Sequence, residues 1–277
     1  MRVPTHTARV DADTAVVYPV MLKCLVSWSV WAALALSTLG CASDGDGKNG
    51  DVGTEPPTTN AATFDEVHEG VYHLGPVDFA ESEWHNACAP VEGYRGDLYV
   101  STGLGGEYLA GVSNELSQGG GVCDACILIE TATGKSIVAR LVTYGVEHAP
   151  GDIDVSPSVF EAIHEGENPR TMSWRFARCP EAAGNLAYEF KSGSNPYWTA
   201  IWVRNPRVPI SKVEVKAQSD DDFVELTRES DGSLVDASGF GDGAFTLRVT
   251  GLDGAVIEEE LPGFEAGQLV QSALQFE

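Results

Sequence analysis

The sequence predicts a mainly β protein, in which a small β-rich barrel or sandwich is followed by a β-sandwich. Short runs rich in β-branched and aromatic residues, separated by turns, fill residues 64–277. Residues 133–135 (Thr-Gly-Lys) and 253–254 (Asp-Gly) have the composition of turns between paired strands. Residues 245–249 alternate apolar and polar side chains, as a half-buried strand does. The length of 277 residues allows two domains of ordinary size.

The charge of the chain makes some classes of partner poor candidates. Its 41 acidic and 17 basic side chains give a net charge of −24 at pH 7. Nucleic acids and anionic membrane surfaces repel such a chain, so neither is expected as a ligand. Most of this charge is expected on a solvated, acidic surface.

Residues 1–41 predict export. Lys23 forms a short basic region, and residues 25–36 are apolar, as in a secretory signal peptide. The apolar stretch is too short and too one-sided for a transmembrane helix. Acidic residues before position 20 do not suit such a leader, so we expect the true start at Met21.

The end of this leader predicts a lipid anchor. Leu39-Gly40-Cys41 is similar to a bacterial lipobox, which would make Cys41 the lipidated residue of an outer-membrane or cell-surface lipoprotein. The alternative is an ordinary signal peptide that is cut nearby, which would give a secreted protein. Residues 42–63 have almost no large apolar side chain and predict a disordered acidic, Pro/Thr-containing linker.

The stretch 121–166 organises the first folded part. Apolar strands are expected on both sides of the turn at 133–135, and Asp154 then precedes a helix that Ser156 caps and Pro157 begins. A second short helix is expected at residues 109–116 from its apolar spacing. A carboxylate just before a fixed helix start has a defined direction, which a binding site needs. The competing role of Asp154 is to assist the cap.

Alternating apolar and polar residues in the second folded part predict six short strands and no helix, and this favours a β-sandwich. The expected strands are Ala187–Ser192, Trp198–Arg204, Lys212–Ala217, Asp222–Thr227, Ala244–Thr250 and Ala255–Leu261.

Four cysteines follow the leader: Cys88, Cys123, Cys126 and Cys179. In an exported protein an even number predicts disulfides, here two, for which three pairings are open. The competing hypothesis is a zinc site with four cysteine ligands, which the single close pair does not favour.

Two stretches resemble the expansins. Cysteines spaced C-x-x-C, two strands around a Gly-Lys turn, and the run Asp152-Ile153-Asp154-Val155-Ser156-Pro157 are similar to the first expansin domain. Residues 184–205 are similar to the opening of the second. The resemblance implies a six-stranded double-psi β-barrel at residues 64–178 and an immunoglobulin-like, carbohydrate-binding β-sandwich at residues 180–277. It also implies the pairing Cys88–Cys123 and Cys126–Cys179.

The resemblance further implies a sugar-binding groove on the barrel. Tyr144 and Asp154 match residues of this groove. The alternative role of Tyr144 is that of a core or rim aromatic. Val142 stands where the family has a second aspartate, and Asp78 lies near the place of its strand threonine. Hydrolysis of a glycosidic bond needs two carboxyl groups, so the groove is expected to bind rather than cut.

On the sandwich, Tyr197 and Trp198 match an adjacent aromatic pair of the family, and Lys191 matches its nearby lysine. Trp202 lies four residues after Trp198 and is expected on the same strand face, where it would extend the aromatic platform. Core packing is the alternative role for each ring.

No cofactor and no metal are expected. His73, His85, His148 and His164 lack the spacing of a metal-binding motif.

These features predict an exported expansin-like protein, expected to be a monomer, that binds wall polysaccharide such as cellulose or a related β-glucan and loosens it without hydrolysis. One alternative is a peptidoglycan lytic transglycosylase of the rare lipoprotein A type, which would make peptidoglycan the partner. The other is a carbohydrate-binding protein with an inactive first domain, which Val142 keeps open.

Overall fold

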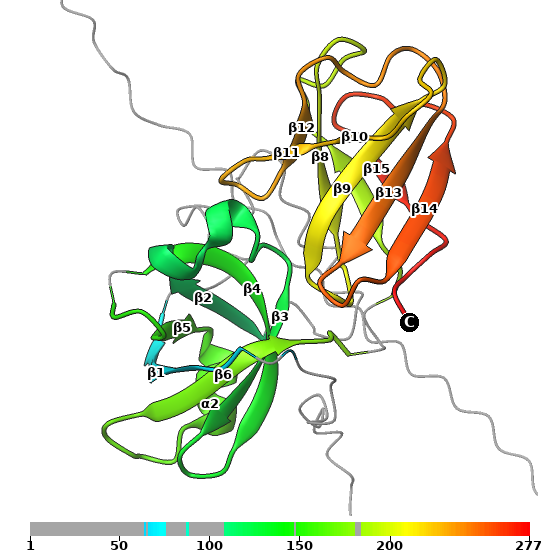
Figure 1. Cartoon of the computed structure of the whole chain (residues 1–277). Coiled ribbons are helices and arrows are strands. Elements are labelled where there is room, and N and C mark those ends of the chain that lie inside the picture. Colours follow the sequence, from blue (N-terminus) through cyan, green and yellow to red (C-terminus); the bar gives the residue numbers. More distant parts are fainter. Residues whose placement is uncertain (1–63, 65, 76–86, 89–107, 147, 181–183) are drawn as a thin grey trace, which may run out of the picture. The chain divides into compact units, whose positions relative to one another are not determined.

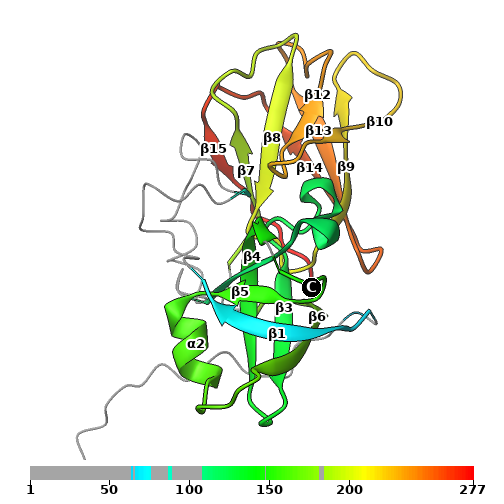
Figure 2. The same ribbon diagram turned by 90° about the vertical axis from the view of Figure 1, so that its left-hand side faces the viewer.

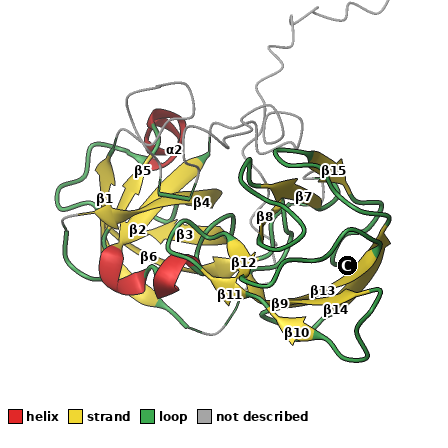
Figure 3. Cartoon of the chain, turned by 90° about the horizontal axis from the view of Figure 1, so that it is seen from above, coloured by secondary structure: helices red, strands yellow, loops and turns green. Residues whose placement is uncertain are grey.

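The computed structural model describes residues 64, 66–75, 87–88, 108–146, 148–180 and 184–277. These residues build a closed six-stranded barrel followed by a sandwich of two sheets (Figure 1), and strand dominates over helix in both (Figure 3). The predicted mainly β fold, a double-psi barrel followed by a β-sandwich, is confirmed. In the described part of the chain no helix is long and apolar enough to cross a membrane.

The barrel is closed by six strands that are not paired in chain order. The order around it is β1-β5-β2-β4-β3-β6, with parallel pairing of β1 with β5 and of β2 with β4. The strands are β1 (His68–Leu74), β2 (Leu109–Ser113), β3 (Cys126–Thr131), β4 (Ser136–Val146), β5 (Ile153–Val155) and β6 (Thr171–Ala177). Parallel pairing brings residues far apart in the sequence to the same end of the barrel.

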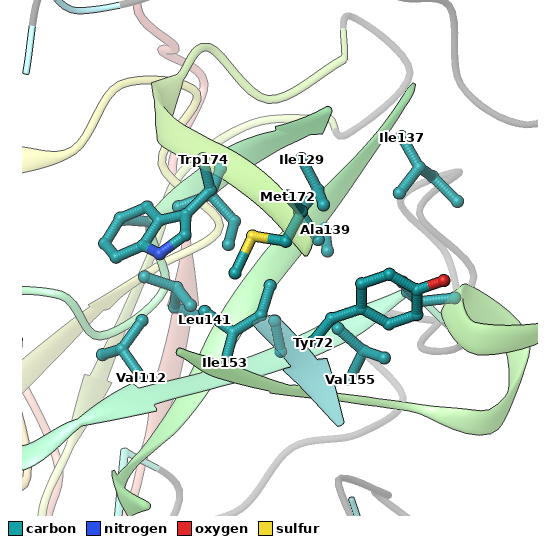
Figure 4. Close-up of a cluster of buried hydrophobic side chains, with 14 of the residues drawn as sticks. Tyr72, Val112, Ile129, Ile137, Ala139, Leu141, Ile153, Val155, Met172 and Trp174 are labelled. Carbon is teal, nitrogen blue, oxygen red and sulfur yellow. The ribbon is translucent and has the colours of Figure 1, made fainter. Parts of the chain in front are cut away.

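Apolar side chains from all six strands fill the barrel (Figure 4). Trp174 and Tyr72 are its largest aromatic members, and both are fully buried. Strands β2 and β3 are buried along almost their whole length, so they lack a simple apolar–polar alternation.

The only α-helix among the described residues, α2 (Pro157–Ile163), packs on the barrel (Figure 2). The Ser156 side chain caps it by accepting a hydrogen bond from the Val159 N–H at 3.4 Å, and Pro157 occupies its first turn, as predicted. The predicted helix at residues 109–116 is wrong: Leu109–Ser113 is strand β2, and only Asn114–Leu116 (η1) forms a 3-10 turn, followed by a second, η2 (Gln118–Gly120).

The sandwich has a four-stranded sheet, β10-β9-β13-β14, and a five-stranded sheet, β11-β12-β8-β7-β15. Its strands are β7 (Ala187–Phe190), β8 (Thr199–Arg204), β9 (Ile210–Ala217), β10 (Val224–Glu225), β11 (Thr227–Arg228), β12 (Leu234–Asp236), β13 (Phe245–Gly251), β14 (Val256–Leu261) and β15 (Leu269–Gln271). Strand β13 alternates buried and half-buried residues, as its sequence predicts. Strands β12 and β15 were not predicted from the sequence. The single strand expected at Asp222–Thr227 is wrong, because this stretch divides into β10 and β11, which belong to different sheets.

Two disulfides, Cys88–Cys123 and Cys126–Cys179, have the predicted pairing. All four cysteines are therefore oxidised in pairs, which rules out the four-cysteine zinc site. Each bridge is expected to stabilise the fold by about 2–4 kcal/mol.

Arg204, at the end of β8, connects the barrel and the sandwich, which lie within one compact unit, residues 52–277. Its guanidinium donates to Glu189 of β7 at 2.8 Å and to Asp124, which precedes β3, at 2.9 Å. It also donates to the backbone carbonyl of Cys88 at 3.0 Å. The guanidinium and both carboxylates are buried, so this is an ion-pair network in the interior.

Candidate functional site

Asp154 lies at the centre of strand β5, on the outer face of the barrel. Its neighbours Ile153 and Val155 are fully buried in the barrel core, so alternation along the strand turns the Asp154 side chain outward. On β2 the paired residue is Gly111, which has no side chain and is itself buried. Asp154 is thus held by a rigid strand at a half-buried position, as its sequence context predicts.

The chain after β1 passes close over Asp154. Gly75 donates its N–H to the Val155 carbonyl at 3.1 Å. A Cβ atom on Gly75 would lie 2.5 Å from the Asp154 Cβ and 2.8 Å from its Cγ. Only glycine fits at position 75 unless Asp154 moves, so this residue is part of what fixes the carboxylate.

Two histidines determine the electrostatic surroundings of Asp154. The Nε2 atom of His148 lies 3.4 Å from the Asp154 Oδ1 atom, and His73 pairs with Asp154 in the register of β1 and β5. Burial raises the pKa of the Asp154 carboxyl above its usual value, and the opposing effects of His148 and His73 do not cancel this. Such a carboxyl can accept hydrogen bonds from sugar hydroxyls and, when protonated, donate one.

Tyr144 is on strand β4, two strands away from Asp154 in the order β5-β2-β4. Its ring packs at the edge of the barrel core, and its hydroxyl donates to the backbone carbonyl of Ser230 in the sandwich. These contacts fit the alternative role of Tyr144 as a core or rim aromatic, and its role in a sugar-binding groove stays a prediction.

Val142 has no access to a ligand. It is 2% exposed, packs against Leu109, and lies where the pairing of β2 with β4 shifts register. The position at which expansins carry the second groove aspartate is therefore an apolar, buried one here. Asp78, the other predicted groove residue, lies outside the described residues.

Sequence reasoning missed three polar neighbours of Asp154. His148 contacts it directly, and His73 and Asp152 contact each other at 3.3 Å. The alternating Asp152-Ile153-Asp154 was a usable signal, because residues i and i+2 of a strand share a face. His73 gave no such signal, since only the pairing of β1 with β5 brings it to Asp154.

On the sandwich, a tight turn of residues 195–198 exposes two aromatic rings. Tyr197 is 78% exposed and Trp198 is 37% exposed. Asn195 and Trp198 close the turn through two backbone hydrogen bonds, of 2.8 and 3.1 Å, and Pro196 follows Asn195. Proline pre-sets the backbone for the second position of such a turn.

This turn is held against the loop that follows β12. Gly241 donates its N–H to the Pro196 carbonyl at 3.0 Å. Gly239 has a φ of +75°, and a Cβ atom there would lie 2.2 Å from the Pro196 oxygen. The close approach needs glycine, and it makes the turn a rigid support for the two rings.

Lys191, the predicted lysine of this site, lies next to Trp198. Both line a shallow pocket of about 370 Å³ together with residues 229–231 and Val235. Lys191 Nζ lies 2.6 Å from the Asp231 carboxylate. Burial opposes ionisation of Asp231, but hydrogen bonds from Lys191 and Ser233 outweigh it and hold the pKa of this carboxyl below its usual value. Asp231 was not predicted from the sequence.

The expectation that Trp202 extends the aromatic platform is wrong. Its side chain is only 4% exposed, and its indole N–H donates to the Asp231 carbonyl at 3.0 Å. Two cations lie over the ring, with Lys191 Nζ and the Arg204 guanidinium each 4.8 Å from its centroid. Trp202 is therefore a buried residue that contacts Lys191, and the exposed platform is a pair of rings.

A double-psi barrel with a surface carboxylate, joined to a sandwich that exposes aromatic rings, makes this chain expansin-like. In sequence it is similar to Expansin-YoaJ of Bacillus subtilis (strain 168), with 26% identity over 208 residues that cover 73% of this chain and 81% of that protein. It is also similar to Expansin-like protein 5 of Dictyostelium discoideum, with 24% identity over 65% of this chain and 77% of that protein. No family model matches the chain.

Solved structures share the fold. A crystal structure of the apo form of a Clavibacter michiganensis expansin superimposes with a TM-score of 0.63 at 20% identity, covering 76% of this chain and 98% of that one. A mutant of that expansin in complex with cellohexaose gives a TM-score of 0.60 at 19% identity, with the same coverage. The resemblance to bacterial expansins that the motifs predicted is confirmed.

Proposed function

We propose that the protein binds β-linked wall polysaccharide, with cellulose as the leading candidate, and loosens it without cutting glycosidic bonds. The observation that carries this proposal is the exposed pair Tyr197 and Trp198, held on a rigid turn beside the Lys191–Asp231 ion pair. Aromatic rings on a surface offer flat apolar area to the faces of sugar rings, and the ion pair offers hydrogen bonds to their hydroxyls. The related Clavibacter expansin, in its complex with cellohexaose, supports a β-1,4-linked ligand.

The carboxylates on the barrel favour binding over hydrolysis. Asp154 is half-buried on the outer face of β5, whereas Val142, at the place of the family's second aspartate, is apolar and buried. Asp152 is a second carboxylate nearby, but one of its oxygens accepts the Val71 N–H at 2.8 Å and the other faces His73. A glycosidase needs an acid and a base or nucleophile on opposite sides of the scissile bond, whereas Asp152 and Asp154 are two residues apart and share a face.

We expect negligible release of reducing sugar from soluble β-glucans between about pH 4 and 8. The test measures product release and binding in parallel, on cellulose, chitin and peptidoglycan, for the wild type and for Asp154→Asn. Binding to a polysaccharide without product is the expected result. Sustained product release that Asp154→Asn abolishes would overturn the non-hydrolytic proposal, and release from peptidoglycan alone would favour the transglycosylase alternative.

One observation favours a second candidate, a carbohydrate-binding protein without loosening activity. Val142 removes a carboxylate that the expansin groove carries. A wall-extension assay beside a binding assay separates the two: binding without extension would support this second candidate.

We also propose that the protein is exported and anchored through Cys41, on the basis of Leu39-Gly40-Cys41 after the apolar stretch. Cys41→Ser should move the protein from the membrane fraction to the soluble extracellular or periplasmic fraction. Cys24→Ser, a cysteine within the leader, is the matched control and should not change the distribution. An unchanged membrane fraction in Cys41→Ser would contradict the anchor.

A further inference from the structure

Two histidines and an aspartate meet at one end of strand β5. We name His73, His148 and Asp152 the histidine cluster. Their potential metal-binding atoms all lie within 4.8 Å of one another. His73 Nε2 is 3.3 Å from Asp152 Oδ2, and the rings of His73 and His148 stack with centroids 3.9 Å apart.

The barrel pairing explains why these residues meet. Strands β1 and β5 are parallel, and His73 pairs with Asp154, so His73 lies two register positions from Asp152, the residue that directly precedes β5. His148 comes from the connection between β4 and β5. The cluster therefore combines a residue of β1, the residue before β5 and a residue of the loop between β4 and β5. Its hydrogen-bonded pair, His73 and Asp152, is 79 residues apart in the sequence.

Two of the three side chains are already positioned. The Val71 N–H donates to Asp152 Oδ1 at 2.8 Å, which leaves Oδ2 directed at His73. The preceding residue, Gly151, is fixed by a hydrogen bond of 2.9 Å from the Trp174 indole to its carbonyl. His148 is the exposed member, on a loop, and it can turn without disturbing the core.

The donor set suits a transition metal. Two imidazoles and one carboxylate are the protein ligands of a common type of open zinc site, and imidazole also favours Cu²⁺ and Ni²⁺. In a tetrahedral zinc site the donor atoms lie about 3.3 Å apart, given bonds of about 2.0–2.2 Å. The His73–Asp152 distance already matches. Stacked rings do not direct both nitrogens at one point, so His148 has to rotate out of the stack.

We propose that the histidine cluster binds one divalent transition-metal ion, with Zn²⁺ as the test ion, next to Asp154. His148 contacts Asp154 as well, at 3.4 Å, so the ion would lie beside a second carboxylate. This revises the expectation, drawn from histidine spacing, that the chain has no metal site. The simpler interpretation of the cluster is two separate histidine–carboxylate hydrogen bonds, and the experiment decides between the two.

The experiment is a calorimetric titration of the full chain, without a histidine tag and freed of metal by chelation, with Zn²⁺ at one fixed pH. We expect one saturable equivalent. His148→Ala and Asp152→Asn should each weaken binding by roughly tenfold or more. Asparagine retains the oxygen that accepts the Val71 N–H, so the loop should keep its place. His148 is exposed, so its removal should not unfold the barrel, and circular dichroism checks this.

The matched control is His164→Ala. His164 is another half-buried barrel histidine, 3.5 Å from the Glu167 carboxylate, and it lies outside the cluster. Its removal should leave Zn²⁺ binding unchanged. Co²⁺ absorption provides a second readout, because coordination by a cysteine thiolate gives a charge-transfer band that nitrogen and oxygen ligands do not. No saturable binding, binding that survives both His148→Ala and Asp152→Asn, or a thiolate band that accounts for all bound metal would overturn the proposal.

Discussion

Replacement of Arg204 by methionine is expected to lower the free energy of unfolding by about 3–5 kcal/mol. Arg204 is 1% exposed, and its guanidinium lies 2.9 Å from Asp124 and 2.8 Å from Glu189. Both carboxylates are themselves buried. The variant therefore removes Arg204 from two buried carboxylates. The cost of keeping these negative charges away from water is then no longer offset by their attraction to the guanidinium.

Two further variants test this explanation. The triple variant Arg204→Met, Asp124→Asn, Glu189→Gln removes the charges together and should regain most of the loss. Arg248→Met is the matched control: Arg248 is a partly exposed arginine of the same sandwich, 2.6 Å from Glu258, and its loss should cost about 1 kcal/mol or less. Urea denaturation followed by tryptophan fluorescence gives the comparison. A loss below about 1 kcal/mol for Arg204→Met would contradict the buried-charge explanation.

Local features of this fold were predictable from the sequence because short-range physics decides them. Ser156 and Pro157 begin helix α2, since one supplies a cap and the other a pre-set φ. The turns at 133–135 and 253–254 join the strand pairs β3–β4 and β13–β14. The disulfide pairing and the double-psi topology came from the family resemblance, because spacing alone left three pairings open.

The errors occur where tertiary burial overrides the local pattern. Residues 109–113 form β2 and are buried on both faces. Their apolar residues therefore do not alternate with polar ones as in a half-buried strand, and the spacing resembled that of a helix. Strands β12 and β15 are only three residues long, too short for a periodic signal. Trp202 lies on β8, the strand that follows the turn of Trp198. The loop that contains Asp231 covers the Trp202 indole, and strand geometry alone does not reveal this contact.

The candidate site on the barrel was only half predictable for the same reason. Asp154 is marked by its own neighbours, whereas His73 reaches it through parallel pairing of β1 with β5 across about 80 residues of chain. A search for histidines at fixed spacing cannot find such a group. Asp152 and His148, by contrast, lie within six residues of Asp154 and were accessible to a search for polar side chains around it.

Removal of both exposed rings, in the double variant Tyr197→Ala, Trp198→Ala, is expected to reduce binding to insoluble cellulose by at least about tenfold. Each ring that stacks on a sugar should contribute about 1 kcal/mol or more, although adjacent residues are not expected to be additive. Tyr197 is the more exposed ring, so it has more area to lose on binding, whereas Trp198 also lines the pocket with Lys191. Both single variants should therefore bind more weakly than the wild type.

The fold should tolerate these changes, because both side chains are on a surface turn whose backbone is held by Pro196, Gly239 and Gly241. Val224→Ala is the matched control: Val224 is an exposed apolar residue, 51% accessible, on β10 of the other sheet, and its truncation should leave binding unchanged. Depletion isotherms at low protein concentration give the affinities, and near-ultraviolet circular dichroism reports the fold. If the double variant binds as the wild type does, polysaccharide is held elsewhere, and the barrel surface at Asp154 is the next site to test. Equal weakening by Val224→Ala would instead indicate a general loss of surface hydrophobicity, not stacking at Tyr197 and Trp198.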